Sequence, residues 1–108
     1  MAMGAQAAYG VSPLLIGRDC IELYNCAQRD DVQSGRAIQL KVNIIRAALR
    51  KCDATPAACI RELANMRGLA GGHPRAPITT LSDADKQILQ EASDAVGITP
   101  VAQPAMAN

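Results

Sequence analysis

The chain of 108 residues contains no tryptophan and no phenylalanine, and Tyr9 and Tyr24 are its only aromatic side chains. Hydrophobic residues still make up 49% of the sequence, so the core has to be built from leucine, isoleucine, valine, alanine and methionine. Side chains of this kind suit the packing of helices on helices. The shortage of aromatic rings argues against single-stranded nucleic acid as a ligand, because such ligands bind by stacking their bases on aromatic side chains.

The sequence also lacks an excess of charge of either sign. Eleven lysines and arginines balance ten acidic residues, which gives a net charge of +1 and a pI of about 7.7. A protein this close to neutral has no strong field to attract nucleic acid or an anionic membrane, and we expect neither as a partner. The apolar runs are too short to span a bilayer, and residues 1–10 have no basic leader, so we expect a cytoplasmic protein.

Residues that commonly bind metals are few. The sequence has one histidine, His73, which we expect to be exposed in a loop, and four cysteines: Cys20, Cys26, Cys52 and Cys59. Zinc sites use closer pairs of ligands than these, so we expect no metal and no cofactor. The even number of cysteines leaves two disulfides possible. Because each cysteine lies in a helical apolar pattern and no export signal precedes them, free thiols are favoured.

Apolar residues recur at helical spacing in four segments, which predicts an all-α fold of four helices. The predicted helices are residues 13–28, a segment from the Asp30-Asp31 cap to about Lys51, residues 56–67, and residues 83–96. Residues 1–12 are expected to form a short strand or an irregular arm, residues 13–98 the helical domain and residues 99–108 a flexible tail. Ser82 resembles the first residue of a capping box, with Asp85 in the position usually taken by glutamate.

The second predicted helix is the most regular of the four. Its apolar residues form two neighbouring stripes that we expect to be buried, namely Ile38, Val42, Ile45 and Leu49, and Ala37, Leu40, Ile44 and Ala48. Ile21 and Tyr24 are expected to widen the buried face of the first helix. Three cations, Arg46, Arg50 and Lys51, crowd the end of the second helix; we interpret them as complementing the helix dipole rather than as a phosphate site.

Several short stretches, taken together, resemble one enzyme family. They are Tyr9-Gly10-Val11-Ser12 with Gly17-Arg18-Asp19, Leu23-Tyr24 with Asp30-Asp31, Arg36-Ala37-Ile38-Gln39, Thr55-Pro56-Ala57 with Arg67-Gly68-Leu69, Arg75-Ala76-Pro77-Ile78 with Leu81-Ser82, and Gly97-Ile98. In this order they resemble the last third of the dihydrodipicolinate synthase and N-acetylneuraminate lyase family of class I aldolases. The resemblance covers nearly all of residues 4–98.

The resemblance implies a part of a (β/α)8 barrel. Residues 4–12 correspond to the eighth strand, residues 13–28 to the helix after it, and the other three helices to the family's C-terminal helical extension. By resemblance alone, Tyr9 and Gly10 line the mouth of the pocket. Ala7 and Gly10 depart from the Gly and Ser usual in that strand, and Leu14 stands where Asn is common.

The chemistry implied by the resemblance needs a lysine that forms a Schiff base with a 2-oxo acid. The three lysines here, Lys41, Lys51 and Lys86, all fall on predicted amphipathic helices, where we expect them to be solvated or to snorkel. We therefore assign no catalytic residue to this chain.

Two functions remain open at this level, beside a third possibility, that the likeness to the family's last third is accidental and the chain is an unrelated helical protein. The first is a truncated member of the family that is inactive alone and acts as a scaffold or oligomerisation fragment. It would form a homo-oligomer or dock on a complementary barrel chain, and a pyruvate-like substrate would bind only in a complete barrel. The second is a free-standing helical module for protein–protein interaction, without enzymatic activity.

Overall fold

The computed structural model describes residues 3–10, 13–98 and 100–101, and these contain four α-helices and no strand. The helices are α1 (Pro13–Gln28), α2 (Val32–Lys51), α3 (Pro56–Met66) and α4 (Asp83–Val96). The predicted all-α class is therefore confirmed. Residues 3–10 form an irregular arm rather than a strand. Residues 1–2 and 11–12 of the predicted arm and most of the predicted tail lie outside the described residues.

Three helices begin at the capping residues that the sequence indicates. In each case a side-chain oxygen of the capping residue accepts a hydrogen bond from the backbone N–H three residues ahead; the capping residues are Asp31, Thr55 and Ser82. Such a cap typically stabilises a helix by about 1 kcal/mol. At the other ends, Gly68 and Gly97 adopt the left-handed conformation, with φ of 81° and 72°, which glycine reaches without steric cost.

Helix α1 is bent near its start, which the sequence pattern did not predict. Ile16 has φ −129° and ψ 45°, outside the helical region. Arg67, at the end of α3, donates hydrogen bonds from Nη1 to the carbonyls of Leu14 and Leu15. These bonds satisfy carbonyl groups at the bend, as expected where a side chain inserts into the helical ladder.

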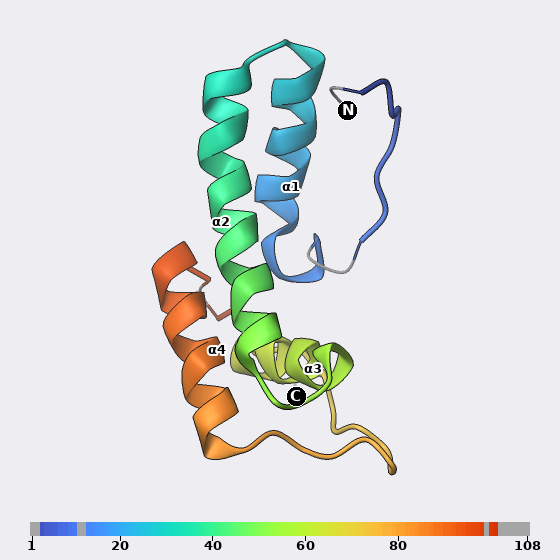
Figure 1. The fold of residues 1–108 in the computed structure, drawn as a ribbon, viewed down its shortest axis with the longest axis vertical. Helices are drawn as coiled ribbons and strands as arrows, with labels where there is room; N and C mark the ends of the chain where they lie inside the picture. The colour runs from blue at the N-terminus through green and yellow to red at the C-terminus, as the bar shows by residue number, and fades with distance from the viewer. Residues whose placement is uncertain (1–2, 11–12, 99, 102–108) are drawn as a thin grey trace, which may run out of the picture.

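Helices α1 and α2 form an antiparallel hairpin, α4 runs along the lower part of α2, and α3 crosses beneath them (Figure 1). The largest fully buried side chains, Ile45, Leu63 and Leu89, come from α2, α3 and α4. The core therefore sits at the lower end of the hairpin. The radius of gyration is 15.5 Å, compared with about 13 Å for a compact domain of this length, because the upper half of the hairpin projects beyond the core.

The projecting hairpin explains where the predicted core was wrong. Leu40 and Ile44 of α2 are 57% and 40% exposed, and Ile21 and Tyr24 of α1 are also exposed. Each belongs to an apolar stripe that the sequence shows correctly. No described element buries Leu40 and Ile44, and the arm, which accepts a hydrogen bond from Tyr24, leaves that side chain 40% exposed. Helical periodicity identifies an apolar face; it does not say which partner buries that face.

Candidate functional site

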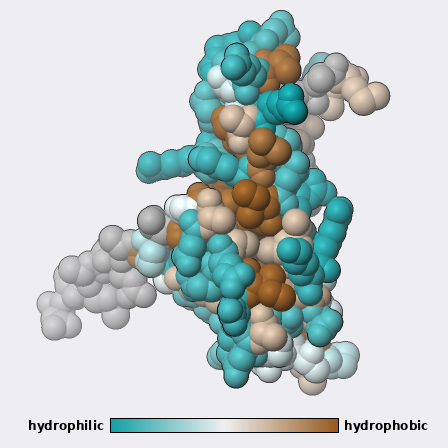
Figure 2. Space-filling model, turned by 60° about the vertical axis from the view of Figure 1, so that its left-hand side comes forward, coloured by the Kyte–Doolittle hydropathy of each residue, from teal (hydrophilic) through white to brown (hydrophobic). Residues whose placement is uncertain are grey.

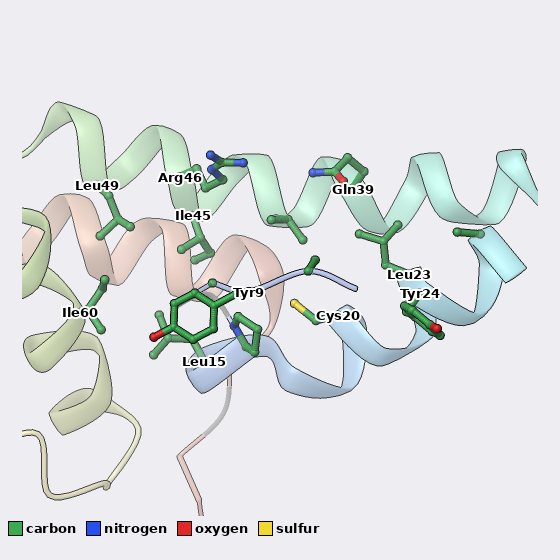
Figure 3. Close-up of a pocket in the computed structure, with 15 residues that line it drawn as sticks. Tyr9, Leu15, Cys20, Leu23, Tyr24, Gln39, Ile45, Arg46, Leu49 and Ile60 are labelled. Carbon is green, nitrogen blue, oxygen red and sulfur yellow. The ribbon is translucent and has the colours of Figure 1, made fainter. Parts of the chain in front are cut away.

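An apolar groove lies between the arm, α1 and α2, and reaches α3 at its lower end. Its volume is about 770 Å³. Fifteen residues line it, and most are aliphatic or small: Ala8, Tyr9, Gly10, Pro13, Leu15, Cys20, Leu23, Tyr24, Ala27, Gln39, Val42, Ile45, Arg46, Leu49 and Ile60. Figure 3 shows the labelled side chains of α1 and α2 pointing into this region, with Tyr9 of the arm among them. The groove is larger than a second cavity of about 220 Å³ that lies beside α3.

The arm lies along this groove without being buried in it. Tyr9 and Gly10 both line the groove, but the Tyr9 side chain is fully exposed. The Tyr24 hydroxyl donates a hydrogen bond of 3.4 Å to the carbonyl of Gln6, and this is the only hydrogen bond found between residues 3–10 and the rest of the described chain. The structure thus brings the two predicted pocket residues to one surface. Their role in lining a substrate pocket stays a prediction.

Besides Tyr24, three polar or reactive side chains reach the groove from the helices. Gln39 and Arg46 extend from α2, and the Cys20 thiol comes from α1 (Figure 3). Partial burial is the main cause that raises the pKa of the Cys20 thiol, and the negative charge of Asp19 raises it further. A raised pKa keeps the thiol protonated near neutral pH, so Cys20 is a poor nucleophile. The groove therefore resembles a packing surface more than a reactive centre.

All three lysine side chains are exposed to solvent. Lys51 and Lys86 are exposed, as predicted. Lys41 is exposed as well, and its Nζ lies 3.5 Å from Oδ1 of Asp19 on α1. A Schiff-base lysine needs a desolvated amine with a lowered pKa, and none of the three positions provides that desolvation.

A second cavity of about 220 Å³ lies between α3 and the loop before α4. It gathers four charged or titratable side chains, from Arg61, Glu62, His73 and Lys86, which the sequence did not place together. His73 is exposed there, as predicted. Arg61 Nη1 donates a hydrogen bond of 2.8 Å to the carbonyl of Gly71, so at least this cation is used to hold the loop.

Asp85 is a buried charged residue whose side chain has a different role from the local cap that the sequence pattern predicted. It is 4% exposed, and its carboxylate accepts hydrogen bonds from the backbone N–H groups of Asp53 at 3.0 Å and Ala54 at 3.2 Å. Ser82 does cap α4 by accepting from the Asp85 N–H. The Asp85 side chain, however, does not turn back to complete a capping box. It ties the start of α4 to the turn between α2 and α3.

The four cysteines are free thiols, two of them buried. Burial is the main cause that raises the pKa of Cys59 to about 12, and it also raises the pKa of Cys52. Both thiols donate to backbone carbonyls, Cys52 to Ala48 and Cys59 to Ala54. They pack as small apolar residues. Within residues 3–10, 13–98 and 100–101 no three His, Cys, Asp or Glu side chains are grouped so as to hold a metal ion.

None of the four described helices has the length and hydrophobicity needed to cross a bilayer.

Comparison with curated proteins finds a partial relationship. The chain is 32% identical over 91 residues to an N-acetylneuraminate lyase from Rhizobium meliloti (strain 1021). The matched region covers 84% of this chain but 30% of that lyase, so the chain spans less than a third of the relative's length. No protein-family model matches the chain, and no solved structure matches it. The resemblance to the dihydrodipicolinate synthase and N-acetylneuraminate lyase family is thus supported as a partial relationship.

Proposed function

We propose that this chain is one portion of a Schiff-base aldolase or lyase of the N-acetylneuraminate lyase type, and that it serves as scaffold rather than as the catalytic centre. The observation that carries the proposal is the 91-residue match to a lyase of which it covers 30%. The order of the sequence stretches assigns this portion to the last strand, the helix after it and the helical extension. The reaction of the complete enzyme cleaves or forms a carbon–carbon bond beside a 2-oxo acid.

The apolar groove supports this assignment. The resemblance makes residues 4–12 the eighth strand of a barrel, and a barrel strand is hydrogen-bonded on both sides. Here the arm is joined to the described helices by the single bond from Tyr24 to Gln6. Its remaining backbone groups are free for neighbouring strands. The groove walls of α1 and α2 provide the apolar surface on which a barrel rests.

The lysine positions support the scaffold role. Imine formation needs an amine in a desolvated pocket, whereas Lys41, Lys51 and Lys86 are all exposed. The Schiff-base lysine therefore belongs to a complementary part of the barrel, and a pyruvate-like substrate binds only when that part is present. Tyr9 and Gly10 then lie near the pocket mouth.

Borohydride trapping tests this proposal. The chain is incubated with pyruvate and borohydride, alone and together with a chain that supplies the first seven strands, and each chain is weighed by mass spectrometry. We expect no adduct on this chain in either mixture and an adduct on the complementary chain. A reduced pyruvate adduct on Lys41, Lys51 or Lys86 of the chain alone would overturn the scaffold assignment.

A second function is favoured by the helical core. Ile45, Leu63 and Leu89, each at most 1% exposed, pack the helices together without help from a barrel. A chain with its own core can work as a free-standing interaction module. Size-exclusion chromatography with light scattering separates the two functions. A folded chain that forms no complex with the seven-strand chain favours the interaction module, and a complex of one copy of each favours the lyase portion.

A further inference from the structure

The outward side of α2 carries a second apolar surface, separate from the groove. Ala37, Leu40, Ile44 and Ala47 follow one another at spacings of three, four and three residues, and all four are exposed. This is the spacing of the two apolar positions in a coiled-coil heptad. We call these four residues the α2 outer face. Helical periodicity turns this face away from α1, since Gly35, on the opposite side of α2, lies against Cys26 and Leu23 of α1.

Figure 2 shows the side of the molecule on which α2 and α4 come forward. Hydrophobic side chains form a vertical strip there, bordered by hydrophilic ones. Leu40 and Ile44, at 57% and 40% exposure, are the large apolar side chains that α2 leaves uncovered in its middle. An exposed apolar stripe with a polar border is typical of a helix-binding surface.

The charges beside the α2 outer face are all positive. Arg36, Asn43 and Arg50 form a row along one edge at seven-residue spacing, Lys41 lies on the other edge, and Lys51 continues the stripe itself. Helix α2 contains five basic residues and no acidic one. Lys41 is paired with Asp19, while the described residues provide no salt bridge to Arg36, Arg50 or Lys51.

This charge pattern decides between possible occupants. Residues that flank the apolar positions of a heptad select the partner helix, because opposite charges attract across the interface and like charges repel. In a dimer formed through this face, Arg36 and Arg50 would face the basic residues of the second copy and be repelled by them. An anionic bilayer needs a wider apolar face than two large side chains provide.

We propose that the α2 outer face binds an acidic amphipathic helix of another protein. The partner presents leucine- or isoleucine-type side chains to Leu40 and Ile44 and carries glutamate or aspartate opposite Arg36, Arg50 and Lys41. The face extends over residues 37–47, which is about 16 Å of helix. An interface this short gives a weak and exchangeable complex. The proposal is independent of the lyase assignment, which concerns the other side of the hairpin.

The test uses the full chain and two synthetic helical peptides of three heptads each. Both carry isoleucine and leucine at the apolar positions; one has glutamate and the other lysine at the flanking positions. Binding is measured by fluorescence anisotropy of labelled peptide. We expect the glutamate peptide to bind, with an affinity that falls as salt is added, and the lysine peptide to bind roughly tenfold more weakly or worse.

Variants of the full chain locate the site. Arg36→Glu combined with Arg50→Glu should reverse the preference, so that the lysine peptide binds better. The matched control, Arg18→Glu combined with Arg75→Glu, changes the net charge equally but lies outside α2 and should leave the preference unchanged. Leu40→Ser should lower the affinity for the glutamate peptide by roughly tenfold, because an apolar contact is lost. Circular dichroism confirms that each variant is folded.

Three results would overturn the proposal. One is equal binding of the two peptides, or no binding of either. Another is self-association of the unmodified chain that Leu40→Ser abolishes, which would make a second copy the occupant. The last is binding to vesicles of phosphatidylserine and phosphatidylcholine that Leu40→Ser abolishes, in the absence of peptide binding.

Discussion

At the scale of single residues, Asp85 connects two parts of the fold that are far apart in the sequence. A buried carboxylate is stabilised when it accepts hydrogen bonds from backbone N–H groups, and Asp85 accepts two. Those two donors belong to the turn after α2, more than thirty positions away. The chain pattern Ser-x-x-Asp predicts a local cap, and it predicts the Ser82 half correctly. The hydrogen bonds that the Asp85 side chain accepts depend on where the turn between α2 and α3 lies. No local sequence pattern contains that information.

Replacing this carboxylate should destabilise the protein. In Asp85→Ala, the N–H groups of Asp53 and Ala54 lose their acceptor, and we expect the free energy of unfolding to fall by about 2–3 kcal/mol. Asp85→Asn keeps one side-chain acceptor and should cost about half as much. Urea unfolding followed by circular dichroism measures both. Asp83→Ala, at an exposed first-turn carboxylate, is the control and should cost at most about 0.5 kcal/mol. Equal losses for Asp83→Ala and Asp85→Ala would contradict the bridging role.

The thiol of Cys59 predicts how stability depends on pH. Burial raises its pKa from an ordinary value near 9 to about 12 in the folded protein. The folded state therefore prefers the protonated thiol, and this contribution to stability is complete below pH 9 and is lost as the pH rises toward 12. We expect the free energy of unfolding to decline over that range and to decline less steeply in Cys59→Ala. Parallel pH profiles for the two proteins would show that Cys59 does not contribute.

At the scale of elements, the loop after α3 is held to the helix by close backbone contact at Gly71. A Cβ at this position would lie 2.3 Å from the Arg61 carbonyl oxygen and 2.8 Å from Oδ1 of Asn65. Gly71→Ala therefore forces the loop away and disturbs the two hydrogen bonds between Asn65 and Gly72. We expect a loss of about 1–3 kcal/mol in the free energy of unfolding.

A second glycine gives the matched control. Gly17, in α1, has no atom within 4 Å of a Cβ built on it, so Gly17→Ala should stabilise the protein by up to about 1 kcal/mol. Thermal unfolding of the two variants compares them directly. The role of the loop contact would be contradicted if Gly71→Ala stabilised the protein. It would also be contradicted if Gly17→Ala destabilised the protein as much as Gly71→Ala does.

The elements also show what the sequence was able to predict. Helix boundaries were predicted within a few residues because Asp31, Thr55, Ser82 and Gly97 act on their own neighbours. The bend in α1 was not predicted. The carbonyls beside it are hydrogen-bonded by Arg67, some fifty positions later, and no local pattern contains that contact. Tyr9 and Gly10 do reach the groove, but the groove itself was not predicted, because it forms only when the arm, α1 and α2 are placed together. Asp85 and the cavity beside His73 needed tertiary contacts for the same reason.

At the scale of the whole molecule, the chain exposes more surface than its mass requires. Its accessible surface is 7869 Å², whereas a compact monomer of this mass exposes about 5,700 Å². The projecting hairpin and the arm add to this surface, and both sides of the hairpin carry apolar residues. The groove is the hollow side, close to neutral apart from Arg46, and suits a barrel. The α2 outer face is an exposed helix surface bordered by basic residues, and suits an acidic helix. The two surfaces thus differ in shape and charge, and separate substitutions address them.

If the groove seats the complementary barrel chain proposed above, a charge placed in it should block that chain without unfolding this one. Ala27 lines the groove yet is exposed, so Ala27→Glu leaves the core intact while placing a carboxylate where the partner would desolvate it. We expect the affinity for the seven-strand chain to fall by at least about tenfold, measured by biolayer interferometry. Ile21→Glu is the control, because Ile21 is exposed on α1 and does not line the groove. If Ile21→Glu weakens the complex as much as Ala27→Glu, the partner does not sit in the groove, and the barrel must meet the hairpin on another side.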